Sequence, residues 1–118
     1  MSADSEFVIA VLDLITPFSE VSSRKMFGGF GIFREGLMFG LIADNELYLK
    51  ADKQSLHYFE DSDCPAFCYA KADGKQYKMS YYRAPEAFFE EPEQTILWSQ
   101  RAQDAALRAP RKKKPKKP

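Results

Sequence analysis

Two hairpin signals constrain the fold of this chain more than any other feature of its sequence. Arg34-Glu35-Gly36 combines a polar pair with a glycine that can adopt positive φ, and Asp44-Asn45 has similar turn chemistry. Both signals separate short runs that are rich in aromatic and aliphatic residues. The pattern therefore predicts an antiparallel meander of three strands, Met26–Phe33, Leu37–Ala43 and Glu46–Lys50.

The rest of the chain predicts helices that pack on this sheet and two further strands. Apolar residues from Phe7 to Ile15 recur at helical spacing, Ser2 or Asp4 can cap that helix, and Pro17 ends it. The polar segment Thr16–Lys25 is predicted to be a loop or a short helical turn. The other predicted elements are a helix over Lys53–Phe59 capped by Asp52, strands Phe67–Ala70 and Gln76–Tyr82 around the turn Ala72-Asp73-Gly74, a short turn opened by Pro85, and a helix from Pro92 to about Leu107. We therefore expect an α+β fold, an antiparallel sheet with helices packed on it, in the order α-β-β-β-α-β-β-α.

Three glycines, Gly28, Gly29 and Gly31, raise the question of a phosphate-binding loop. They lack the Lys-Ser/Thr pair of a Walker loop and the spacing of a dinucleotide fingerprint, and Ile32-Phe33 continues a strand. Glycine within a strand marks a bulge or a close approach of another element. We expect a flattened patch that lets a helix lie close to the sheet. A small-ligand or catalytic site near Gly28–Gly31 is the alternative.

Cys64, Cys68 and His57 are the residues that could carry metal or acid–base chemistry. A structural zinc site needs four ligands, and a general base needs a nucleophile or acid beside it. Neither arrangement can be read here, so we expect no metal, no cofactor and no catalysis. Two reduced, partly buried thiols are the usual finding in a cytosolic chain.

The charges are divided unevenly along the 118 residues. Residues 1–107 hold 10 Lys and Arg against 17 Asp and Glu, a net charge of −7, whereas residues 108–118 carry +7. We predict one folded domain over residues 1–109 and a disordered basic tail over residues 110–118. The tail is either a solubilising end or an electrostatic arm for nucleic acid. Its candidate nucleic-acid contacts are Arg111, Lys112, Lys113, Lys114, Lys116 and Lys117.

The N-terminus lacks the pattern of a signal peptide, and the longest uncharged apolar run, Phe7–Leu12, is too short to cross a bilayer. We therefore expect a cytoplasmic protein that does not enter a membrane.

Aromatic residues are unusually frequent, 17 in all, and they cluster at 27–39, 58–69 and 77–89. Most are expected in the core, where each ring buries a large apolar area. The segment SYYRAPEAFF places tyrosines and an arginine together, a combination favoured at protein interfaces. A face that docks a partner or a second copy of the chain is the alternative to core packing.

Two blocks of the sequence stand out together, KMFGGFGIFREGLMFGLIADNELYLKAD and MSYYRAPEAFFEEPE, the second followed by a helix with Trp98. These blocks resemble one family, the TfoX/Sxy N-terminal domain of bacterial regulators of DNA uptake competence. The similarity covers roughly residues 5 to 107. It implies an α+β fold like that of secretion chaperones and a regulatory role without known catalysis. It also implies a protein partner, a transcription activator of the cyclic-AMP receptor type.

Those regulators carry a second, C-terminal helical domain, whereas this sequence continues into RKKKPKKP, so we expect a stand-alone domain. The family offers no defined catalytic residues to carry over. The candidate interaction residues are Arg24, Lys25, Tyr82 and Arg83. The leading hypothesis is thus a non-enzymatic, protein-binding regulatory module, which could also pair with itself. A nucleic-acid accessory protein that uses the basic tail is the second hypothesis.

Overall fold

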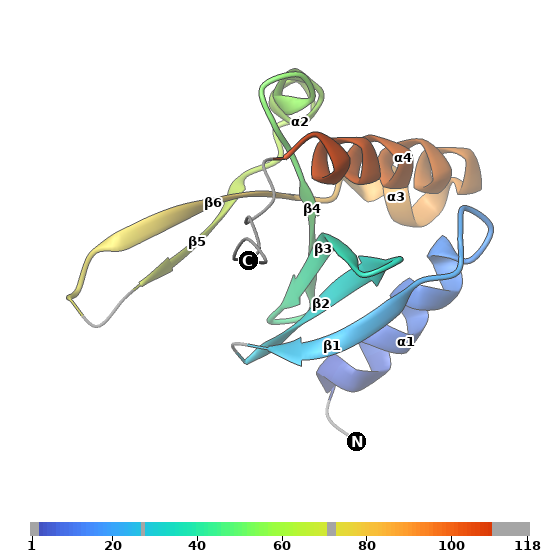
Figure 1. Cartoon of the computed structure of the whole chain (residues 1–118), viewed down its shortest axis with the longest axis horizontal. Coiled ribbons are helices and arrows are strands. Elements are labelled where there is room, and N and C mark those ends of the chain that lie inside the picture. The colour runs from blue at the N-terminus through green and yellow to red at the C-terminus, as the bar shows by residue number, and fades with distance from the viewer. Residues whose placement is uncertain (1–2, 27, 71–72, 110–118) are drawn as a thin grey trace, which may run out of the picture.

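A computed structural model describes residues 3–26, 28–70 and 73–109 (Figure 1). The basic tail lies outside the described residues. The elements are, in order, α1 (Ala3–Ile15), β1 (Ser22–Met26), β2 (Gly29–Arg34), β3 (Leu37–Ala43), β4 (Glu46–Lys50), α2 (Leu56–Asp61), β5 (Ala66–Ala70), β6 (Gln76–Arg83), α3 (Glu86–Glu90) and α4 (Pro92–Arg108). None of the described helices is long and apolar enough to span a membrane.

The strands form one antiparallel sheet in the order β1-β2-β3-β4-β6-β5. Helices α1 and α4 lie against one side of this sheet, and the β5–β6 hairpin extends away from them (Figure 1). The α+β fold and the predicted order of elements are confirmed, with one strand, β1, and one short helix, α3, added.

Both predicted hairpin turns are confirmed by their backbone angles. Glu35 and Gly36 have φ of 52° and 80°, and Asp44 and Asn45 have φ of 52° and 62°. Two successive residues with positive φ are the pattern of the turn whose twist matches a two-residue hairpin. The meander from β2 to β4 is therefore set by local turn chemistry.

The core lies between the sheet and the helices. Alternate residues of the meander point to it, and Ile32, Ile42 and Leu49 are fully buried there. From the helices, Val11 and Trp98 join the same cluster. Burial of these apolar surfaces is what fixes α1 and α4 on the sheet.

Two sequence predictions about the segment before the meander were wrong. Ser22–Met26 is an edge strand, not part of a loop, although all of its side chains except Met26 are exposed. The range Met26–Phe33 does not form one strand. Gly28, with φ of 77°, separates β1 from β2. A polar edge strand buries no face, so it shows no alternation of apolar and polar residues.

Two boundaries after the meander also differ from the prediction. Helix α2 begins at Leu56, not at Lys53, because the Asp52 carboxylate accepts hydrogen bonds from the Gln54 and Ser55 amides in the preceding turn. The short turn predicted at Pro85 continues into helix α3.

The glycines do not make room for a helix, and that prediction was also wrong. Gly29 and Gly31 lie on the sheet face opposite to core residue Ile32. A Cβ at Gly29 would overlap the backbone carbonyl oxygen of Ile42, and one at Gly31 would meet side chains of the sheet itself. Other groups do approach these two glycines closely, but those groups belong to the strands of the sheet and their side chains.

Candidate functional site

One face of the sheet carries no described helix, and it brings together residues from five strands. Direct strand pairing places Arg24, Gly31, Leu41, Tyr48 and Arg83 side by side in one row. Directly paired residues of antiparallel strands share a face. The helices pack on the opposite face, which holds the core (Figure 1). We call the face that bears this row the helix-free face.

The centre of the helix-free face is apolar and adaptable. A Cβ at Gly31 would lie 2.7 Å from the Met26 sulfur, 2.9 Å from the Phe33 ring and 3.1 Å from the Met38 sulfur. These three side chains therefore fill the space above Gly31, and all three are half-buried. Methionine side chains adapt to different partners because they are unbranched and polarisable.

Tyr81 lies on this face, where it pairs with Lys50. Its side chain is buried, and its hydroxyl donates a hydrogen bond to the Met38 carbonyl oxygen at 3.3 Å. Burial raises the pKa of Tyr81 to about 12, so the phenol stays protonated at neutral pH. The Lys50 ammonium lies 5.3 Å from the centre of the Tyr81 ring. The Tyr81 phenol therefore acts as a fixed support, not as an acid or base.

Arginines stand toward both ends of the row, in different environments. The Arg24 guanidinium lies 4.9 Å from the centre of the Phe33 ring, a cation–π arrangement. Arg83 instead forms an ion pair with Glu46, with 2.9 Å between Nε and Oε1. Among the described residues, no carboxylate is ion-paired with Arg24. Its charge is thus available to a partner, whereas that of Arg83 is balanced.

The four predicted interaction residues are therefore not one site. Arg24 and Arg83 share the helix-free face, while Lys25, which pairs with Phe30, points to the other side of β1. Tyr82 is only 9% exposed, and its ring lies 5.5 Å from that of Phe59 in the core. Little of the Tyr82 ring is therefore exposed at the surface. The predicted nucleic-acid residues belong to the tail and lie outside the described residues.

Sequence reasoning missed the residues at the centre of the face, Met26, Phe33, Met38 and Tyr48. The signal was present in the two hairpin turns, which fix the register that aligns Gly31, Leu41 and Tyr48. Predicting the helix-free face also required strand β1, and the polar sequence of β1 did not indicate a strand.

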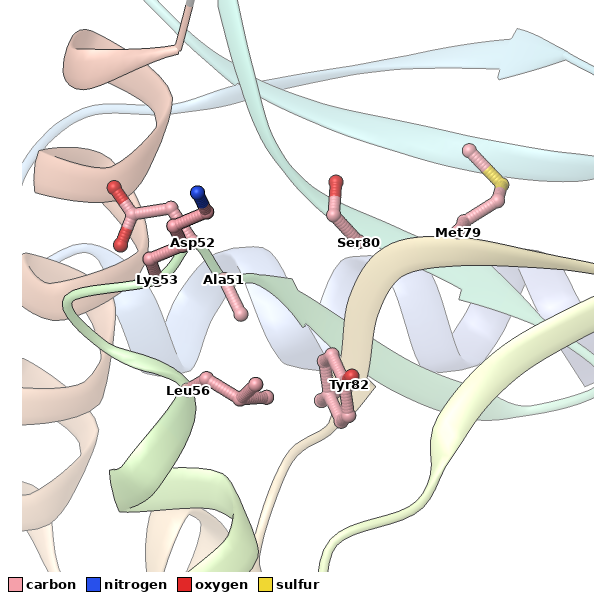
Figure 2. A pocket seen from close by; sticks show the side chains of 7 residues that line it. All are labelled: Ala51, Asp52, Lys53, Leu56, Met79, Ser80 and Tyr82. Carbon is pink, nitrogen blue, oxygen red and sulfur yellow. The ribbon is translucent and has the colours of Figure 1, made fainter.

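A separate hollow of about 280 Å³ opens between the end of β4, α2 and β6 (Figure 2). Its lining residues are Ala51, Asp52, Lys53, Leu56, Met79, Ser80 and Tyr82. The Asp52 carboxylate points away from Leu56 and Tyr82 (Figure 2). Arg108 holds it, with 2.7 Å between Nε and Oδ2, and this hydrogen bond, aided by those from Ser55, lowers the pKa of Asp52 to about 2. The Asp52 carboxylate is therefore ionised, and in that form it anchors α4 through Arg108.

The glycines, cysteines and histidine do not form a described site. Strand β2 is paired on both sides, so Gly29 and Gly31 lie within the ladder and do not line the hollow between β4, α2 and β6. Cys64 is buried, which raises the pKa of its thiol, and Cys68 is exposed. Residues 3–26, 28–70 and 73–109 contain no group of three or more His, Cys, Asp or Glu side chains placed to hold a metal ion.

Over the residues that it describes, the structure thus defines a small α+β domain whose antiparallel sheet is covered by helices on one side only. Residues 13–106 match the TfoX N-terminal domain, so the chain belongs to that family, as its two sequence blocks predicted. It is 26% identical over 96 residues to Protein Sxy of Escherichia coli and 27% identical over 92 residues to DNA transformation protein TfoX1 of Aliivibrio fischeri. These alignments cover 81% and 78% of this chain but only 46% and 44% of the relatives, so the chain spans less than half of either.

Proposed function

We propose that this chain is a regulatory module without catalytic activity that binds another protein through the helix-free face. The observation that carries the proposal is the row from Arg24 to Arg83, in which five strands present an adaptable apolar centre and a cation. Aromatic residues, methionine and arginine are enriched at protein interfaces. Membership of a family of competence regulators supports a regulatory role.

The chemistry of the face indicates what the partner should present. Arg24, stacked on Phe33, offers a planar guanidinium suited to a carboxylate. Met26 and Met38 pack over Gly31 and are half-buried, so an apolar side chain of the partner can contact them. We propose that the partner is a cytoplasmic protein whose surface presents an acidic group beside an apolar side chain. By family resemblance the first candidate is an activator of the cyclic-AMP receptor type.

The test is isothermal titration of the full chain with the purified activator of this type encoded in the same genome. Arg24→Ala should weaken binding by about fivefold to thirtyfold, the effect of losing an interface arginine, ~1–2 kcal/mol. Lys25→Ala is the matched control, because Lys25 is the next residue of β1, is also exposed, and points to the other side. Its affinity should stay within about twofold of that of the unmodified chain.

Two results would count against this proposal. Absence of binding by the unmodified chain would reject the activator as the partner. Equal losses for Arg24→Ala and Lys25→Ala would show that general charge, not the helix-free face, drives the association. Circular dichroism of both variants checks that the fold is retained.

The separation of charge in the sequence favours a second candidate function, nucleic-acid binding by the basic tail. Arg108 is paired with Asp52, so the cations from Arg111 to Lys117 are the ones this function would use. With six such charges, the affinity for duplex DNA should fall with a log–log salt slope of at most about 5. Deletion of residues 110–118 should abolish binding, and DNA binding that survives the deletion would reject the tail mechanism.

A further inference from the structure

Lys50 is a second cation of the helix-free face. Leu49 of β4 is buried in the core, so alternation along the strand turns Lys50 to the opposite side. Its pairing with Tyr81, and the 5.3 Å between its ammonium and the centre of the Tyr81 ring, place the charge on that face. Among the described residues, no carboxylate is ion-paired with Lys50.

The Lys50 ammonium is partly desolvated as well as unpaired. Burial lowers the pKa of Lys50, and the charge of Asp52 opposes this shift. The Asp52 carboxylate is already held by Arg108, with 2.7 Å between Nε and Oδ2. The ammonium donates one hydrogen bond to the Ser80 hydroxyl, at 2.6 Å. A lysine ammonium has three donors, so a carboxylate of a partner can accept another one and offset the lost hydration.

Arg24 and Lys50 lie on opposite sides of the apolar centre of the face. Direct pairing places Arg24 and Tyr48 in one row, three strand spacings apart, and Lys50 lies two residues beyond Tyr48. At about 4.8 Å per spacing and about 3.4 Å per residue, the Cα atoms of Arg24 and Lys50 are about 16 Å apart. Phe33 and Met38 pair with each other on the two strands between them. The face therefore presents a cation, an apolar surface and a second cation along one diagonal.

We propose that Lys50 is the second anchor of the helix-free face, and that the partner presents two carboxylates on either side of an apolar side chain. This inference rests on the proposed function and adds the second anchor to it. Each cation lies by its own ring, Arg24 by Phe33 of β2 and Lys50 by Tyr81 of β6, so one carboxylate does not serve both. Arg83 is not an anchor, because it is already ion-paired.

The first experiment titrates variants of the full chain with the activator used to test the proposed function. Lys50→Met removes the charge but keeps an unbranched stem, and it should weaken binding by about threefold to tenfold. Lys50→Arg keeps the charge and should bind within about twofold of the unmodified chain. Lys53→Ala is the matched control, because it removes an equal charge beyond the end of β4, in the hollow beside α2. Since the anchors lie about 16 Å apart, the losses from Arg24→Ala and Lys50→Met should multiply in the double variant.

The outcomes of this titration separate the inference from the proposed function. Unchanged binding by Lys50→Met, together with weakened binding by Arg24→Ala, would overturn the inference and leave the proposed function in place. A double variant that binds no more weakly than Arg24→Ala alone would also overturn it, because one carboxylate would then serve both cations. If neither single variant weakens binding, the proposed function is contradicted as well.

The second experiment does not depend on the activator. Its probe is a synthetic helical peptide whose two glutamates stand eleven residues apart, about 16 Å along the helix, with two leucines between them on the same side. A matched peptide carries glutamine in place of one glutamate. We expect the first peptide to shift the Met38 methyl resonance at lower concentration, and to lose that advantage with Lys50→Met. Equal binding of the two peptides, or no shift with either at millimolar concentration, would overturn the proposal.

Discussion

Gly29 and Gly31 stand two residues apart on the same face of β2, but they meet different kinds of neighbour. An added Cβ would overlap a backbone carbonyl oxygen at Gly29, whereas at Gly31 it would press on the ends of methionine and phenylalanine side chains. Backbone in the middle of a paired ladder cannot move away, but long side chains can change rotamer.

We therefore expect Gly29→Ala to destabilise the domain by about 1–3 kcal/mol, as overpacking does, and Gly31→Ala to cost less than about 1 kcal/mol. Urea unfolding of both variants measures the two free energies. A larger loss for Gly31→Ala would show that the methionines are held rigidly, against the adaptable surface described here. Gly31→Ala should instead weaken partner binding, because the added methyl group displaces the Met26, Phe33 and Met38 side chains on the helix-free face.

The pair Asp52–Arg108 makes stability depend on pH. Because the pKa of Asp52 is lowered to about 2 in the folded state, chiefly by the hydrogen bond from Arg108, the pair stabilises the fold above the unfolded pKa of about 4. That stabilisation is lost as the pH falls from about 4 to about 2. Both side chains are partly exposed, so solvent screening limits the contribution to about 1 kcal/mol.

Arg108→Ala should therefore lower the free energy of unfolding by about 1 kcal/mol at neutral pH and by almost nothing near pH 2. Chemical denaturation across this range gives the two values. The exposed neighbour Lys53 provides the control, since Lys53→Ala should change stability little at either pH. A loss for Arg108→Ala that is equal at both ends of the range would contradict the assigned role of the ion pair.

At the scale of elements, α4 shows how one helix separates core from surface. Trp98 is 4% exposed and its ring lies 4.9 Å from that of Phe59, whereas the neighbouring Leu97 is 39% exposed. Trp98→Ala should destabilise the domain by about 3–5 kcal/mol, and Leu97→Ala by about 0.5 kcal/mol. Thermal or urea unfolding distinguishes the two. Similar losses would mean that the Leu97 face of α4 is covered in solution.

The elements that the sequence predicted best are those whose signals are local. Strands β3 and β4 have their predicted bounds because turn residues with positive φ flank them. The edge strand β1 could not be predicted, since its sequence SSRKM buries no face and its conformation depends on pairing with β2. Pairing of this kind leaves no periodic signal in the strand itself.

The candidate site was predicted only in part, for the same reason. Arg24 and Arg83 were selected as exposed cations near the family blocks, but their common face follows from pairing across five strands. Tyr82 was selected from its neighbourhood in sequence, and alternation along β6 places it in the core. One residue of register decides between the two faces.

At the scale of the whole molecule, the sheet has two different faces and two different edges. One face holds the core with α1 and α4, and the other carries the row from Arg24 to Arg83. The β1 edge is charged and the β5 edge is uncharged.

The most direct test of the central claim is methyl NMR of the methionines during titration with the purified activator. Met26 and Met38 flank Gly31 on the helix-free face, and the Trp98 indole reports on the core. We expect the Met26 and Met38 methyl resonances to shift with bound fraction while the indole resonance stays in place. Binding that leaves both methyl resonances unchanged would show that the partner contacts another surface, and would contradict the assignment of the helix-free face.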